Sequence, residues 1–412
     1  MSNYRNILVV VVVAIFYTNV PGYINMIATS TADSAPKFWA IGLGVLSFPL
    51  VIAQLLRSNI LKSPLIVWCF GYAWVAVAWF FLSSQSDIAW EEVRQRVLSI
   101  FELLMFLVLF THPNATKLAR QALVVGVLFG VALNIYEFFV PMSFSHILGR
   151  SAGLYLNPNL SGEALVMGMV CSVSVLPSRF RGLFILFTGI GIFATLSRGG
   201  ILAWMITVMG LMFRGGVRLK DFLLPVSAGL LLLVVVLLPR FDELYATFEI
   251  TGASNKNVEE RLSWFTDPTG VSDYSSWERA YLAKQAWEKI ADHPLIGSGT
   301  GSAREDALFG GSHNQFLALM RDHGLLGAAI LPLLVLAVTW GASRETRLLV
   351  MVFGSATIVL SLFTHTLLHQ SYSLMLFALM AAMASSSREG ESKKMQVEMA
   401  GRVGAPKDLV GI

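Results

Sequence analysis

The stretch LFILFTGIGIFATLSRGGILAWMITVMGLM, residues 183–212, decides the fold class of this chain. It contains two apolar runs, beginning near Leu183 and Gly199, that are separated only by a very short connection around Arg198. A helix that crosses a bilayer needs roughly 20 mostly apolar residues, and each run approaches that length. The stretch is therefore interpreted as a tight hairpin of two membrane helices with an arginine at its turn.

The composition of the whole chain fits the same environment. Of its 412 residues, 55% are hydrophobic and 14% are charged, and the mean hydropathy is +0.65, the reverse of a soluble domain. The sequence predicts an all-α fold, a polytopic membrane helix bundle of about twelve transmembrane helices. The expected spans begin near Ile7, Phe38, Pro64, Val97, Gln121, Leu160, Leu183, Gly199, Phe222, Gly324, Leu348 and Tyr372.

The positive charges predict the orientation, because short cytoplasmic loops carry more Lys and Arg than external ones. With the N-terminus in the cytoplasm, the short cytoplasmic loops hold eleven such residues and the short external loops hold five. Both termini are therefore expected in the cytoplasm. The charges are scattered between apolar segments rather than gathered in one tract, so no nucleic-acid partner is expected. Cys69 and Cys171 both lie in apolar runs, which excludes a disulfide framework.

One connection, residues 240–322, is much longer than the others, and the charge pattern places it outside the cytoplasm. Long ordered connections beside a rigid scaffold are where function concentrates. We expect residues 1–384 to form the transmembrane bundle, including 240–322 as a periplasmic loop that contains short helices. Residues 385–412 are polar and are predicted to be a disordered cytoplasmic tail.

Residues 275–291 of this loop are predicted to form an amphipathic helix. At helical spacing Arg279 shares one face with the apolar residues Leu282, Ala286 and Ile290. A guanidinium on an apolar face needs an anionic partner, which is either a carboxylate of the loop or a bound anion.

Three other arginines and a histidine are candidates for anion binding or proton transfer. Arg198, beside two glycines that let a ligand approach the backbone, suits a phosphate or diphosphate, although an interfacial arginine can also be a simple anchor. Arg150 is a candidate second anion contact, and Arg261, beside two glutamates, is either such a contact or a solvated charge. His313 opens a helix that re-enters the membrane layer. Its imidazole either accepts a proton from a hydroxyl or only forms an interfacial hydrogen bond.

The sequence predicts neither a nucleotide loop nor a metal site, and no cofactor is expected. The segment PLIGSGTG, residues 294–301, is preceded by no expected strand and followed by no Lys-Ser or Lys-Thr, so it is interpreted as a tight turn beside the membrane. His323, His365 and His369 lie in external regions but lack a zinc-binding spacing. The chain also has no external Asp-x-Asp of the kind that metal-dependent glycosyltransferases use.

In their order and predicted topology, these features resemble the O-antigen ligase and polymerase superfamily of bacterial envelope enzymes. The resemblance covers roughly residues 150–327. It rests on the sequence around Arg198, on Arg279 followed by Trp287 and PLIGSG, on His313 heading a helix, and on the single large external loop. Both Arg261 and Arg279 can match the loop arginine of the family. Arg279 is preferred because it alone is followed by the Trp and Pro-Leu-Ile-Gly sequence.

The resemblance implies a metal-independent, inverting glycosyltransferase of the bacterial inner membrane, with its active site at the periplasmic face among membrane lipids. The donor would be a glycan on undecaprenyl diphosphate and the acceptor the lipid A-core oligosaccharide. Arg198 and Arg279 would hold the diphosphate, with Arg261 or Arg150 assisting, and His313 would take the proton of the attacking hydroxyl. The single dominant loop favours the ligase over the polymerase and the protein O-oligosaccharyltransferase of the same superfamily. A lipid-linked sugar transporter is the alternative outside it.

Overall fold

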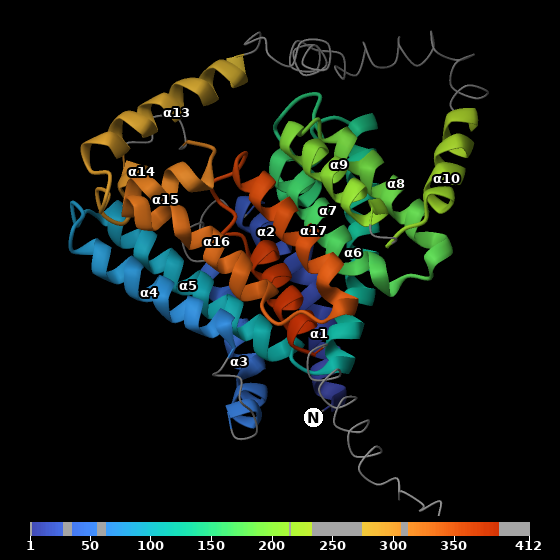
Figure 1. The fold of residues 1–412 in the computed structure, drawn as a ribbon, viewed down its shortest axis with the longest axis horizontal. Coiled ribbons are helices and arrows are strands. Elements are labelled where there is room, and N and C mark those ends of the chain that lie inside the picture. Colours follow the sequence, from blue (N-terminus) through green and yellow to red (C-terminus); the bar gives the residue numbers. More distant parts are fainter. Residues whose placement is uncertain are drawn as a thin grey trace, which may run out of the picture.

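The structure, a computed structural model, describes residues 2–27, 35–55, 63–213, 216–232, 274–305 and 312–386, and within these ranges it is helical and has no strand (Figure 1). In chain order the helices are α1 (Ser2–Val12), the π-helical η1 (Val13–Tyr17), α2 (Val20–Ile27), α3 (Ala35–Leu55), α4 (Pro64–Phe80), α5 (Asp87–Phe110), α6 (Pro113–Phe139), the 3-10 turn η3 (Gly153–Tyr155), α7 (Pro158–Ser172), the 3-10 turn η4 (Val173–Val175), α8 (Ser178–Ala194), α9 (Arg198–Phe213), α10 (Leu219–Leu232), α13 (Tyr274–Asp292), α14 (Ser302–Glu305), α15 (Gln315–His323), α16 (Leu325–Thr339), α17 (Arg344–Ser361) and a last helix, Ser371–Ser386.

The all-helical class predicted from the sequence is confirmed for the described residues. Every expected span begins within one of these helices or one residue before it. By length and hydropathy, α6 is the one described helix able to cross a membrane alone, and α1 with η1 meets the same criterion together with α2, across a bend of 52°. Other apolar helices, such as α4 and α9, are shorter. The number of crossings and the side on which the long connection lies stay predictions.

The centre of the bundle is formed by α7 and the last helix, which are buried on nearly all sides. A helix that is apolar all round is stable only in such a position or in lipid. By contrast, α3 and α4 present large apolar side chains outward, among them Phe38, Phe48, Phe70 and Trp74. Soluble proteins rarely expose apolar surface on this scale, so these outer faces are suited to contact with lipid.

Residues 183–212 contain the two predicted helices, as α8 and α9, joined by a turn at Thr195–Ser197. The amide N–H of Leu196 donates to the carbonyl of Phe193 at 2.9 Å, which closes the end of α8. The first turn of α9 packs closely on α7, since a Cβ added at Gly200 would lie 3.3 Å from Cα of Gly162. Small residues allow this approach of two helix backbones. The turn fixes Arg198 at the start of α9.

The long connection contains short helices, as predicted, where it is described. In Figure 1, α13, α14 and α15 lie on the side of the bundle that carries α4 and α5, away from α8, α9 and α10. α15 contacts α13 and α16, and α14 contacts α5. Residues 240–273 of the predicted loop and 387–412 of the predicted tail lie outside the described residues.

Candidate active site

The predicted amphipathic helix of the loop is present as α13, within one residue of the expected bounds at each end. Its apolar face is the predicted one, because Leu282, Ala286 and Ile290 are buried. Ala286 and Ile290 pack together with Leu317 of α15. Arg279, near the start of α13, is close enough to His313, just before α15, for its charge to act on that imidazole.

His313 is held in a defined position just before α15. Its backbone φ is +49°, in the left-handed region. The side chain of the next residue, Asn314, caps α15 by accepting the N–H groups of Phe316 at 2.9 Å and Leu317 at 3.2 Å. The His313 ring meets the ring of His365 edge to face, with centroids 5.4 Å apart. A non-glycine residue held in this conformation is a feature that clusters at functional sites.

The surroundings of His313 favour the neutral imidazole. Burial lowers the pKa of His313, the positive charge of Arg279 lowers it further, and Glu278 acts in the opposite direction. A neutral imidazole can accept a proton, which a charged one cannot. Arg279 therefore places a positive charge near His313 and favours the neutral form of its imidazole.

Arg150 and Arg198 lie together at the α8–α9 turn. The Nε of Arg150 donates to the carbonyl of Thr195 at 3.1 Å, and its Nη2 donates to Oδ1 of Asn159 at 3.1 Å. Two donors of Arg150 are thus used within the protein and help to fix the turn. Arg261 lies outside the described residues.

The α8–α9 turn is connected to His313 through the segment between α17 and the last helix. Gly199 packs on Phe363, where a Cβ added to the glycine would lie 2.6 Å from the ring. Two residues later in that segment is His365, the neighbour of His313. Two packing contacts, joined by this short piece of chain, thus link the start of α9, where Arg198 lies, to the histidine.

A polar cavity of about 560 Å³ lies next to His313, among α5, α14, α15 and the segment before the last helix. Its lining includes Glu92, Arg304, Gln315, His365 and His369. The His369 ring lies 3.4 Å from Oε1 of Glu92, and Arg304 lies 3.8 Å from Oε2. Burial alone would raise the pKa of Glu92, but its interactions with His369, Arg96 and Arg304 lower it to about 2, while burial lowers the pKa of His369 itself.

Sequence reasoning missed this cavity. Arg96 is one of the five positive charges that the predicted topology assigns to the short external loops, whereas the structure buries it in α5. There it donates from Nε to Glu92 at 2.9 Å and pairs with Asp322 and His323 of α15. The i,i+4 spacing of Glu92 and Arg96 was the available local signal. The partner Asp322 is 226 positions away, and nothing in the local sequence points to it.

The glycine-rich segment 294–301 is a tight turn, as predicted, and it ties α15 to α4. Thr300 donates from Oγ1 to the carbonyl of Ala76 at 2.9 Å, and the N–H of Gly299 donates to the carbonyl of Asp322 at 3.0 Å. At Gly301 φ is +94°, and a Cβ there would lie 2.6 Å from Cα of Ala89. The glycines are therefore required by backbone conformation and by close packing.

Replacing Gly301 with alanine is expected to lower the free energy of unfolding by about 1–3 kcal/mol, because the backbone is left-handed and Ala89 leaves no room. The midpoint of thermal unfolding in detergent would measure the effect. Gly42→Ala in α3 is the matched control, since no described atom lies within 4 Å of a Cβ added there. Equal midpoints for the two variants would contradict a structural role for the turn.

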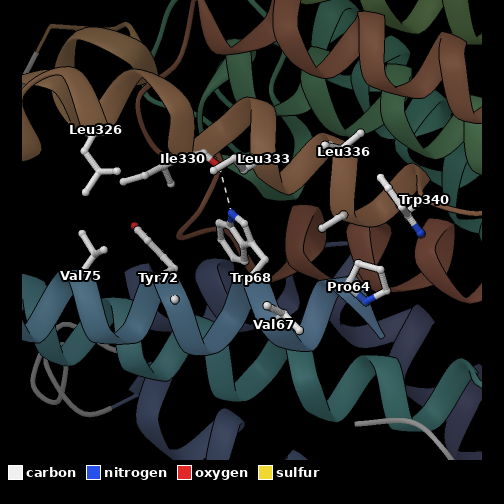
Figure 2. Close-up of a pocket in the computed structure, with 12 residues that line it drawn as sticks. Pro64, Val67, Trp68, Tyr72, Val75, Leu326, Ile330, Leu333, Leu336 and Trp340 are labelled. Carbon is white, nitrogen blue, oxygen red and sulfur yellow. Dashed lines mark hydrogen bonds between the residues drawn. The ribbon is translucent and has the colours of Figure 1, made fainter. Parts of the chain in front are cut away.

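A second hollow, of about 370 Å³, is an apolar groove between α4 and α16 (Figure 2). Figure 2 shows the indole N–H of Trp68 donating to the carbonyl of Ile330, at 2.9 Å, across the groove. Its described lining is aliphatic and aromatic, and includes no charged residue and no histidine. The groove can hold a hydrocarbon chain, but it offers no side chain that can accept a proton near pH 7. Titratable side chains line the polar cavity beside His313 instead. The polar cavity is therefore the better candidate for a reaction site.

The described residues thus form an all-helical bundle with outward-facing apolar side chains, in which a partly buried histidine lies near an arginine and beside a polar cavity. Residues 183–332 match the family model described as O-Antigen ligase. The match confirms the resemblance seen in the sequence: over this segment the chain is similar to a family of glycosyltransferase-like membrane enzymes of lipopolysaccharide biosynthesis. A comparison with curated proteins finds no match.

The matched segment contains four of the predicted site residues, Arg198, Arg261, Arg279 and His313, and leaves out Arg150. Much of the polar cavity also lies outside it, since α5 precedes the segment and the histidines at 365 and 369 follow it. The site thus combines residues of the matched segment with residues from both flanking parts of the chain.

Proposed function

We propose that this protein is an O-antigen ligase, which moves a glycan from undecaprenyl diphosphate to the lipid A-core oligosaccharide at the periplasmic face of the inner membrane. The observation that carries the proposal is the placement of Arg279 beside a neutral, partly buried His313. A cation for the diphosphate and a base for the hydroxyl are the two groups that such a transfer needs. The family match supports the same class of reaction.

In the proposed reaction, Arg279 and Arg198 hold the diphosphate of the donor, with Arg150 or Arg261 assisting. His313 takes the proton of the acceptor hydroxyl while the hydroxyl oxygen forms a bond to the anomeric carbon. The bond from that carbon to the diphosphate oxygen breaks, and the diphosphate leaves with the electron pair. The arginines offset the charge that grows on it. Attack from the face opposite the leaving group inverts the anomeric centre.

Reconstitution into lipid vesicles tests the proposal. Wild-type protein, given glycan on undecaprenyl diphosphate and lipid A-core, is expected to transfer the glycan in the presence of a chelator and without nucleotide. Loss of transfer on chelation would overturn the metal-independent route. Growth of the glycan on its own lipid carrier would establish the polymerase instead, and movement of the donor between leaflets without transfer would establish a transporter.

The proposed location of the site requires that residue 254, in the long connection, face the periplasm. In spheroplasts with an intact inner membrane, a Ser254→Cys variant is expected to react with a thiol reagent that cannot cross the membrane. A Lys117→Cys variant should react with the same reagent only after the membrane is permeabilised. The native Cys69 and Cys171 are buried, so they give little background. The opposite labelling pattern would place the site on the cytoplasmic side and contradict the proposed topology.

A further inference from the structure

The polar cavity lies on the face of α15 that is turned away from α13. Leu317 and Met320 pack toward α13, whereas Gln315, Ala318 and Asp322 line the cavity. α15 therefore separates Arg279, on the side proposed for the donor, from a second compartment. His313 lies just before α15, at its N-terminal end, beside His365 of the cavity wall.

Two polar atoms of the cavity wall are buried and lack a partner within the described part of the chain. They are Oε1 of Gln315, a residue only 3% exposed, and Nδ1 of His365. Buried polar groups are nearly always hydrogen-bonded, because leaving one unsatisfied is costly. The amide oxygen of Gln315 can only accept, so the missing partner is a donor such as a hydroxyl.

The charges of the cavity argue against a second phosphate site. Arg96 is paired with Glu92 and Asp322, and Arg304 lies beside Glu92, so the positive charges are matched by carboxylates. The groups left to bind a ligand are neutral, including the side chains of Gln315, His365 and Gln370 in the lining. Amides and neutral imidazoles suit a ligand rich in hydroxyl groups and without net charge, and the volume is that of an ordinary small-molecule site.

We propose that this cavity binds the sugar of the acceptor that carries the attacking hydroxyl. The inference rests on the proposed function and assigns it a second substrate site, separate from Arg279 on the other side of α15. The sugar would donate a hydroxyl hydrogen bond to Gln315 and present the reacting hydroxyl to His313 at the end of α15. The donor diphosphate would approach the same histidine from the side of Arg279.

Gln315→Leu tests the assignment, with vesicle-reconstituted protein and lipid A-core as the probe. The KM for lipid A-core is expected to rise roughly three- to ten-fold, as for the loss of one neutral hydrogen bond, while donor affinity stays at the wild-type value. Gln370→Leu, on another part of the cavity wall, is a second variant, which keeps the test valid if Gln315→Leu folds poorly. Gln121→Leu, on the exposed surface of α6, is the matched control and should change neither quantity.

The possible results separate the inference from the function on which it rests. A wild-type protein that performs no transfer overturns the proposed function. Normal transfer with an unchanged KM for lipid A-core in both cavity variants overturns only the acceptor site. A fall in donor affinity without a change in the acceptor KM also overturns it, because the cavity would then hold the donor.

Discussion

A His313→Ala enzyme is expected to turn over roughly 100-fold to 10,000-fold more slowly than wild type while binding the donor with unchanged affinity, which is the range for loss of a general base. The expectation follows from its position. The imidazole is partly buried just before the first residue of α15, and burial together with the charge of Arg279 lowers its pKa. It is therefore neutral near pH 7 and can take a proton, while alanine cannot. Single-turnover rates and equilibrium binding of the lipid donor would separate the two effects.

The control for this variant is His293→Ala, which removes an exposed imidazole from the same connection and should leave the rate unchanged. Wild-type turnover should fall as the pH drops through the pKa of His313, because protonation abolishes the base. This fall should begin at a pH below the ordinary pKa of histidine. Near-normal turnover of His313→Ala would remove the base assignment, and a carboxylate or another histidine would then have to accept the proton.

Loss of either proposed diphosphate arginine is expected to reduce donor affinity and turnover together. Removing a charged hydrogen bond from a poorly hydrated site costs about 1.5–3 kcal/mol, or roughly 10-fold to 150-fold in binding. Arg198→Ala and Arg279→Gln should both show this loss. Arg198→Lys should recover only part of it, because an ammonium group lacks the planar fork that pairs two phosphate oxygens. Donor binding and transfer rate would be measured for each variant.

Arg279→Gln has a second consequence that Arg198→Ala need not share. Without the positive charge of Arg279, the pKa of His313 rises, so the acid limb of the rate profile should move to higher pH. Lys284→Gln is the matched control, since Lys284 belongs to the same helix but its side chain is 77% exposed. An unshifted acid limb in Arg279→Gln would contradict the electrostatic contact with His313, and unchanged donor affinity would contradict the diphosphate role.

The positions of the helices were predictable because hydropathy and helical spacing depend only on residues that are close together in the sequence. The expected spans fall on helices, and the apolar face of α13 was correctly identified because Leu282, Ala286 and Ile290 recur at helical spacing. The glycine-rich turn was also predicted, since glycines without a phosphate-binding residue after them are typical of close backbone packing. The length of individual helices was less predictable, since several apolar helices, such as α4 and α9, are shorter than a full span.

The candidate site was only partly predictable, and the reason is sequence separation. Arg198, Arg279 and His313 stand out as charged or titratable residues at unusual places in an apolar chain. The cavity is not predictable in this way, because Glu92, Gln315 and His369 come from distant parts of the sequence. They line one cavity only in the folded protein, where α5, α15 and the segment before the last helix meet. Gln315 carries no distinguishing sequence pattern, and only the three-dimensional structure shows that its buried amide oxygen has no partner among the described residues.

The pairing of Arg96 with Asp322 limits which segments of this protein can be exchanged in a chimaera. Asp322 lies inside the family-matched segment, but its cation is on α5, far upstream. A chimaera that receives residues 183–332 in a bundle lacking that arginine would bury an uncompensated carboxylate, at a cost of about 3–5 kcal/mol. Residues 183–332, which match the family model, therefore cannot be transferred alone. A chimaera that folds must also contain the first part of α5, which carries Arg96.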